Sequence, residues 1–216
     1  MSGADLSKVN LAGARLRNAD LSGADLTYSR LGTANLRFAN LAGAILPVAT
    51  LRRANLRGAN LSGADLRKVD FREARMRDAD LSGADLTNAN LSFADRTGAN
   101  LKGELLWRTD LYKAALENAD LTNADFSDAN LEGAILYRAD IEGAKFNGAD
   151  LSNSNLTDTD ISEEQIRSAN VLGVDYERNP DHLPGVKVTA DSITDDEVQD
   201  FYDEIYENDN KREIID

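Results

Sequence analysis

The sequence predicts an all-β solenoid in which four short units make one coil, and three regularities predict it. From Leu6 to Ile161 every fifth residue is a centre position, and 31 of these 32 centres are apolar, 25 of them leucine. The residue two places before the centre is alanine in 25 units, and the residue between them is Asp or Asn in 23. Glycines and arginines also recur every twenty residues. Internal repeats of this kind determine the fold before any local feature does.

A five-residue period matches neither an α-helix nor a long strand. Within one unit the Ala and the Leu are two residues apart, so a short extended stretch turns both to one side and the Asp or Asn to the other. The last two residues are mostly small or polar, as in Ser22-Gly23, and are typical of a turn. Each unit therefore buries one small and one large apolar residue, and stability must come from stacked neighbours.

The twenty-residue recurrence predicts four units in each coil. Seven of twelve glycines at the last position of a unit share one phase of that period, from Gly3 to Gly143. Arg17, Arg37, Arg57 and Arg77 repeat at the same interval. Residues 4–163 then form about eight coils, and at about 4.8 Å per coil the rod is roughly 34–38 Å long.

The A-(D/N)-L-x-x pattern resembles the pentapeptide-repeat family, and the resemblance covers about three-quarters of the chain. It implies a right-handed, quadrilateral β-helix with the central Leu or Phe and the preceding Ala columns inside. It implies binding rather than catalysis, because members with assigned roles are mostly binding proteins with varied targets.

Composition and charge narrow the function classes. The chain has no cysteine, which excludes disulfides, thiolate metal sites and a cysteine nucleophile. We expect a cytoplasmic protein without a membrane segment, because no 18-residue apolar run exists and the repeat starts at Ala4. The net charge is +4 over residues 1–100, −9 over residues 101–166 and −9 over residues 167–216. Such a dipole steers partners and does not specify the fold.

The pattern divides the chain into a β-helix over residues 1–166 and a C-terminal connector with an amphipathic helix over residues 167–216. Ser162 to Gln165 resembles a capping box that opens a short helix, and residues 169–171 resemble a last degenerate unit. A second capping box at residues 194–197 precedes a helix at about 195–208. Its apolar face consists of Val198, Phe201, Tyr202, Ile205 and Tyr206. Because a two-turn stripe is unstable alone, this helix either caps the β-helix or forms a homodimer.

Two inward positions carry charge. Arg96 occupies a centre and Glu104 occupies an alanine position on the opposite face of the same coil. The register predicts an internal ion pair across the lumen, and the alternative is a local bulge that releases both to solvent. Removing one partner of a buried pair costs about 3–5 kcal/mol.

Two outward surfaces are candidate binding sites. The first is a candidate partner-binding patch with a hot-spot composition, made of Leu105, Trp107, Arg108 and Tyr112 together with Ile45 and Val48 three coils earlier. Either a protein partner or the C-terminal connector of the chain could cover it. The second is a basic column made of Arg17, Arg37, Arg57 and Arg77, with Arg52, Arg53 and Arg72 on the adjoining face. It is either a solvated ladder relieved by Glu73 and Asp78 or a site for an anionic partner.

The remaining polar residues do not indicate a catalytic or metal site. The Asp/Asn positions recur on every coil, which suits backbone hydrogen bonding and solubility. His182, the only histidine, lies between two prolines with no evident partner. We expect no enzyme activity, no cofactor and no metal, since an enzyme needs differentiated groups that converge in a pocket.

Two function hypotheses follow. In the first, the rod presents flat faces to a protein partner. In the second, the resemblance implies a quinolone-protection protein, a homodimer joined through the C-terminal helix whose acidic rod mimics DNA toward gyrase or topoisomerase IV. The acidic residues 101–216 favour the second hypothesis, and the basic first hundred residues oppose it. Direct nucleic-acid binding through the arginines is a weaker hypothesis.

Overall fold

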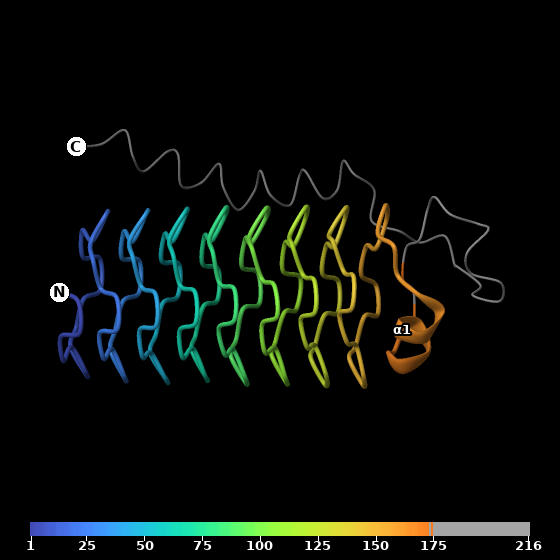
Figure 1. Cartoon of the computed structure of the whole chain (residues 1–216), viewed down its shortest axis with the longest axis horizontal. Helices are drawn as coiled ribbons and strands as arrows, with labels where there is room; N and C mark the ends of the chain where they lie inside the picture. The colour runs from blue at the N-terminus through green and yellow to red at the C-terminus, as the bar shows by residue number, and fades with distance from the viewer. Residues whose placement is uncertain (173, 175–216) are drawn as a thin grey trace.

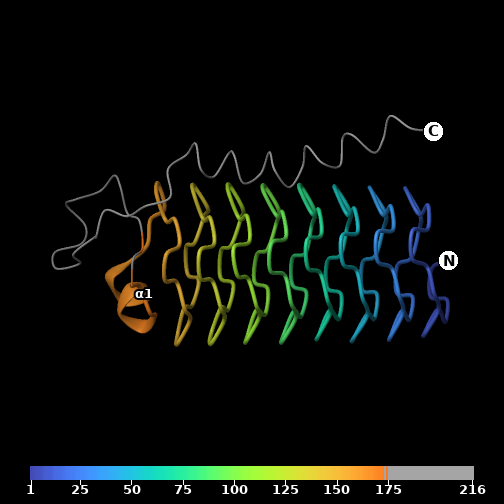
Figure 2. The same ribbon diagram turned by 180° about the vertical axis from the view of Figure 1, so that it is seen from behind.

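The protein is a straight, four-sided solenoid in the computed structural model, which describes residues 1–172 and 174 (Figure 1). Parallel β-bridges join residues that are twenty apart, from Asp5 with Asp25 to Ile135 with Asn155. The coils therefore stack in one row, as Figure 2 shows from behind. This arrangement confirms the predicted solenoid and its four units per coil.

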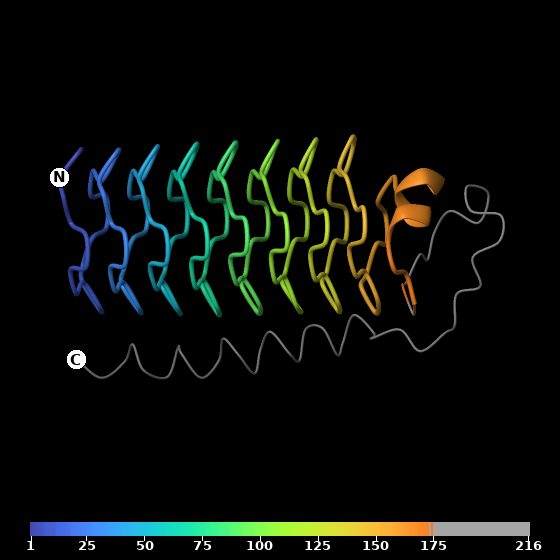
Figure 3. The same cartoon turned by 90° about the horizontal axis from the view of Figure 1, so that it is seen from below.

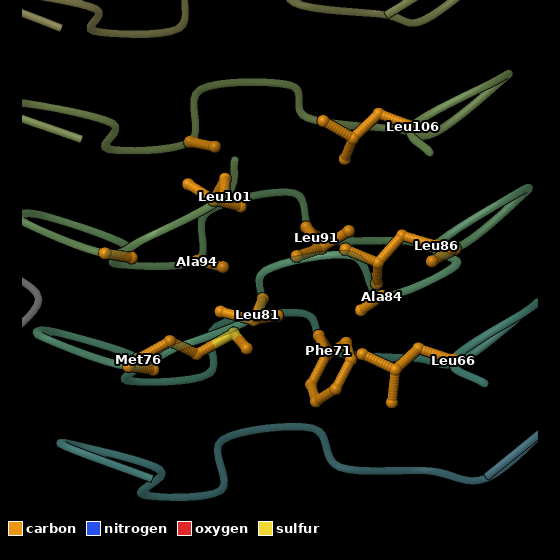
Figure 4. Close-up of a cluster of buried hydrophobic side chains, with 14 of the residues drawn as sticks. Leu66, Phe71, Met76, Leu81, Ala84, Leu86, Leu91, Ala94, Leu101 and Leu106 are labelled. Carbon is orange, nitrogen blue, oxygen red and sulfur yellow. The ribbon is translucent and has the colours of Figure 1, made fainter. Parts of the chain in front are cut away.

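The lumen is filled by the centre residues and the preceding alanines. Leu21, Ala24 and Leu26 are fully buried, and the same holds for almost every equivalent position further along the rod. Figure 4 shows such side chains from successive coils pointing inward against one another. Phe126 and Phe146 stack one coil apart, with ring centroids 5.1 Å apart and planes 5° from parallel. Burying each leucine contributes about 1.5–3 kcal/mol, and contact with the next coil is what provides that burial.

The corners are tight turns with one residue in the left-handed region. The last residue of every unit from Gly3 to Asp158 has a φ between 51° and 68°. In each turn the amide of the next alanine position donates to the centre carbonyl, as Ala24 does to Leu21 at 3.1 Å. Twelve of these positions are glycine, and the others accept a side chain despite a cost of roughly 1 kcal/mol or more. Backbone bonds hold these positions in place, because their amides donate to carbonyls of the next coil, as that of Lys8 does to Thr27 at 2.8 Å.

The short helix α1 (Glu163–Ser168) covers the C-terminal end of the row (Figure 3). Its N-cap Ser162 and Gln165 form the predicted capping box. The Gln165 side-chain amide also donates to the carbonyls of Ile141 and Ala144, at 3.1 and 2.9 Å. In this way Gln165 bonds the Ala144 carbonyl, which the backbone of a further coil would otherwise bond, and gives a second donor to the Ile141 carbonyl, which already accepts from Ala144 N.

The five-residue register continues through α1. Ile166 is buried at the next centre position, although it belongs to a helix. Asn170 then bridges to Asp150, so residues 169–171 do form the predicted last unit. The predicted helix at 195–208, with its cap or dimer face of Val198, Phe201, Tyr202, Ile205 and Tyr206, lies outside the described residues. Within residues 1–172, no helix has the length and apolarity needed to cross a bilayer.

Candidate functional site

The interior of the rod holds no site, so the candidate sites are on its outer surface. The described coils contain no group of acidic or histidine side chains that could hold a metal ion. A hollow of about 440 Å³ lies on the outside near α1, lined by Arg138, Asp140, Glu142, Asp158 and Asp160 among others. Its polar groups are acidic side chains and one arginine, which provides no differentiated set for catalysis.

The Asp/Asn column bonds to backbone, as expected from its recurrence. In unit after unit the side-chain oxygen accepts the amide two residues later, as Asp20 does from Ser22 at 3.1 Å. Asn40 donates in turn to Asp20 one coil away, at 3.2 Å. Hydrogen bonds from Ser22 lower the pKa of Asp20, which keeps the carboxylate charged and accepting. These residues therefore fix the turns and do not form a separate ligand site.

Arg96 and Glu104 meet inside the lumen as a buried ion pair. Arg96 Nη2 lies 3.0 and 3.2 Å from the two carboxylate oxygens of Glu104, and both side chains are 0% exposed. Arg96 Nε and Nη1 have no hydrogen-bond partner among the described residues. Desolvation raises the pKa of Glu104 to about 8, and it also lowers the pKa of Arg96. The pair is enclosed on all sides, so it acts on stability and not on a partner.

Most arginines of the basic column are paired with carboxylates. Glu73 lies 2.6 Å from Arg52 and 3.0 Å from Arg53. The remaining pairs join Arg57 to Asp78 at 3.6 Å, Arg72 to Asp70 at 2.6 Å and Arg77 to Asp95 at 2.7 Å. In this part of the column the structure therefore contains the first of the two predicted alternatives, a solvent-exposed row of arginines whose charges are balanced by neighbouring carboxylates.

The two N-terminal members of the column differ from the others. Among the described residues, Arg17 and Arg37 form no ion pair and instead lie over the ring of Phe38, at 5.6 and 5.5 Å from its centroid. Phe38 is 47% exposed, and Arg37 Nε has no hydrogen-bond partner in the described coils. We call Arg17, Arg37 and Phe38 the arginine corner.

The candidate partner-binding patch is divided into two clusters. Leu105 and Ile45 occupy the same column, but the bridge partners between them are Asp65 and Asp85. The first, which we call the Trp107 cluster, consists of Leu105, Trp107 and Arg108. Leu105 and Trp107 are both exposed, Trp107 by 41%. The Trp107 ring carries the Arg108 guanidinium at 4.4 Å, and its Nε1 donates to Asp128 at 3.2 Å.

Tyr112 turns toward the next corner. Its ring packs edge-on against Phe93 with centroids 5.5 Å apart, and the Lys113 ammonium lies 5.3 Å from it. Tyr112 therefore flanks the Trp107 cluster and is partly covered by its own neighbours.

The second cluster is larger than expected from the sequence. Ile45 and Val48 are exposed, and Tyr28, which occupies the corner one coil before Val48, is 57% exposed. Neither Tyr28 nor Phe38 is part of the patch predicted from the sequence. The signal that identifies them is the register itself, because both occupy the last position of a unit, which always points outward.

The chain is similar to known repeat proteins. The family model described as Pentapeptide repeats matches in eight copies, over residues 1–37, 34–72, 64–103, 105–136 and 134–170. No curated protein matches.

Several solved structures are similar in sequence over much of the chain. HetL, a pentapeptide repeat protein involved in heterocyst differentiation regulation from the cyanobacterium Nostoc sp. strain PCC 7120, is 32% identical; the match covers 77% of this chain and 84% of HetL, with a TM-score of 0.38. A trypsin-treated form of QnrB1, a plasmid-mediated fluoroquinolone resistance protein, is 22% identical over 78% of this chain and 79% of its own, with a TM-score of 0.37. A pentapeptide repeat protein of the Arabidopsis thaliana thylakoid lumen is 31% identical over 56% and 80%, with a TM-score of 0.25.

Proposed function

Because the chain belongs to the pentapeptide-repeat family, we propose that it is a non-catalytic rod that binds another protein through its outer surface. Repeat proteins of this kind use an extended, regular surface and not a pocket. The filled lumen supports this proposal, since centre residues and residues at the alanine positions pack it, and the exposed apolar and charged side chains that differ from coil to coil lie on the outside.

One observation carries the proposal. Leu105 and Trp107 expose apolar surface at adjacent outward positions, where most other coils have Asp, Ser or Thr. An exposed tryptophan flanked by an arginine has the composition of an interface anchor, because Trp and Arg dominate the energetics of protein interfaces. We therefore assign the protein-binding site to the Trp107 cluster.

A photo-crosslinking amino acid at position 107 tests this assignment. In an extract of the source cells it should capture a partner that excess unmodified protein displaces, and Leu105→Glu should abolish the adduct. The same group at Tyr137, an aromatic position on another corner, is the matched control. Equal capture at both positions, or none at 107, would contradict the assignment.

A second candidate function is modulation of a type II topoisomerase by DNA mimicry, with two chains joined through the C-terminal helix. The observation that favours it is the charge of −9 over residues 101–166. Acidic side chains repeated at coil spacing along a rigid rod offer the negative field that a DNA-binding groove attracts.

A gyrase supercoiling assay with and without a quinolone tests the second candidate. We expect inhibition, or relief of drug-stabilised cleavage, that weakens in Asp120→Asn/Asp140→Asn. Asn already occupies this column at Asn40 and Asn60, so the backbone hydrogen bonds should survive the change. Asp20→Asn/Asp25→Asn, in the basic half, is the control. No effect of the unmodified protein would exclude this function.

A further inference from the structure

The arginine corner is a cationic surface that the described coils do not neutralise. Arg17 and Arg37 stand one coil apart in one column and form no ion pair among these residues, whereas Arg57 and Arg77, the next two in the column, each pair with an aspartate. Their guanidinium groups lie over the ring of Phe38. Stacking of this kind leaves guanidinium N–H groups free for a carboxylate, although Arg37 Nε itself is buried.

The surrounding sequence provides no carboxylate for these groups. Residues 1–60 contain eight basic and three acidic side chains, a net charge of +5. Asp5 and Asp25 occupy the column on the opposite side of the coil from Arg15, and Asp20 is hydrogen bonded to Ser22 and Asn40. Arg15, two residues before Arg17, is exposed and also forms no ion pair in the described coils. Arg15, Arg17 and Arg37 therefore place three positive charges without an ion pair, among the described residues, at and beside this corner.

The ring of Phe38 is held in place by the next coil. Gly58 lies directly beneath it, and a Cβ at that position would be 2.6 Å from two ring atoms. Glycine lets the ring lie against the backbone while 47% of the side chain stays exposed. The corner thus combines two free guanidinium groups with a fixed aromatic ring, which complements a segment that carries carboxylates beside aromatic side chains.

The chain itself contains such a segment. Residues 194–210 hold eight acidic side chains and no basic one. Phe201, Tyr202 and Tyr206 alternate with these acids in the sequence Asp-Phe-Tyr-Asp-Glu-Ile-Tyr-Glu. The same residues that could cover an apolar surface are therefore surrounded by negative charge.

We propose that the arginine corner is the docking site of the acidic segment 194–210 of the same chain. The segment is long enough to reach it. Val171 and Leu31 are seven coils apart, about 34 Å at the spacing of paired strands. The 25 residues from 175 to 199 span about 38 Å even as a continuous helix, and more if extended. Because the segment is tethered, its effective concentration at the corner exceeds that of a free acidic partner. The inference is independent of the Trp107 cluster, which lies at a different corner of the coil.

A spin label in the segment tests the proposal in the full-length protein. The chain has no cysteine, so Gln199→Cys provides a single attachment site. In the labelled protein, backbone amide signals of Asn18 and Phe38 should lose intensity, while those of Asn118 on the same column keep theirs. Salt at about 1 M shortens the screening length to about 3 Å and should restore the lost signals.

Matched variants distinguish docking at this corner from general attraction to a basic rod. Arg17→Gln/Arg37→Gln/Phe38→Ala should abolish the loss of intensity. Arg67→Gln/Arg72→Gln/Tyr137→Ala removes the same charge and one aromatic ring from elsewhere and should leave the loss unchanged. Both sets alter outward-facing residues, and thermal melting verifies that each variant folds.

Three results would overturn the proposal. The first is an unlabelled-like spectrum of the labelled protein at low salt. The second is a loss of intensity that persists in the arginine-corner variant. The third is a loss seen when labelled protein is mixed with isotopically enriched, label-free protein, because this would assign the corner to a second copy of the chain.

Discussion

Glu104→Ala should destabilise the rod by about 3–5 kcal/mol, because it leaves a buried guanidinium without its counter-ion. In the native protein Arg96 Nη2 bonds to both Glu104 oxygens, while Nε and Nη1 already lack partners in the described structure. Without Glu104, the described coils offer the Arg96 side chain no acceptor at all. Steric strain does not add to this loss, since Ala84 and Ala124 fill the same position in the coils on either side.

The double variant Arg96→Leu/Glu104→Ala isolates the electrostatic origin of this loss. It restores the leucine and alanine that most other units carry, so it should recover most of the lost stability or exceed the native value. Arg96 lies in a column between Met76 and Leu116, both fully buried, and a leucine there continues the apolar stack. The recovery cannot come from a new hydrogen bond, because neither substituted side chain has a polar atom.

Urea unfolding followed by circular dichroism measures both effects. The titration is made about one unit above the raised pKa of Glu104, where its carboxylate is ionised. We compare four proteins: the native protein, the two single variants and the double variant. Their unfolding free energies are comparable only if the dependence on urea concentration, the m-value, is the same, because a solenoid can lose cooperativity between coils. A Glu104→Ala variant within about 0.5 kcal/mol of the native protein would refute the reasoning. A double variant no more stable than Glu104→Ala would refute it as well.

Three further predictions concern the same packing. Burial raises the pKa of Glu104 from 4.5 to about 8, so between these pH values the folded state binds more protons than the unfolded state. The free energy of unfolding should therefore fall as the pH rises through this range. Urea titrations at several pH values measure this slope, and Glu104→Gln should flatten it. Gly58→Ala should cost more than the roughly 1 kcal/mol expected for Gly63→Ala, because both have a φ near +64° but only Gly58 faces a ring; equal losses, or no rescue by Phe38→Ala, would contradict this. Gln165→Ala should cost about 2 kcal/mol and expose the last coil to hydrogen exchange, since one side chain completes the capping box and bonds two carbonyls; unchanged protection there would count against that role.

The fold was predictable because each unit makes the same contacts as the next. One small and one large apolar residue every five positions specify which side chains point inward, and the twenty-residue recurrence of glycine and arginine specifies the size of a coil. The conformation of the last part of the rod could not be predicted from the repeat in the same way. Ile166 keeps the register but reaches the lumen from a helix, and local helix propensity decides that conformation without changing the spacing.

The candidate sites were predictable as columns but not as contacts. The register places Arg52, Arg53 and Arg72 on one corner beside Glu73, which suggests that Arg72 takes the neighbouring carboxylate. In the structure Arg72 turns back to Asp70, and Glu73 is left to Arg52 and Arg53. Long side chains choose between carboxylates of their own coil and of the next one by differences of a fraction of a kcal/mol. The periodicity of the sequence therefore does not predict which carboxylate a given arginine binds.

That choice decides where charge is available for binding. In the middle coils the arginines and carboxylates neutralise one another, so a partner that recognises charge gains little there, because it must first break existing pairs. Arg17 and Arg37 carry no such cost in the described structure. The net charge of +4 over residues 1–100 therefore suggests a larger basic surface than the structure has. Ion pairs neutralise the arginines of the middle coils, and Arg17 and Arg37 stay without one among the described residues. Binding that depends on salt should respond to substitutions at the arginine corner and hardly at all to those at Arg67 or Arg72.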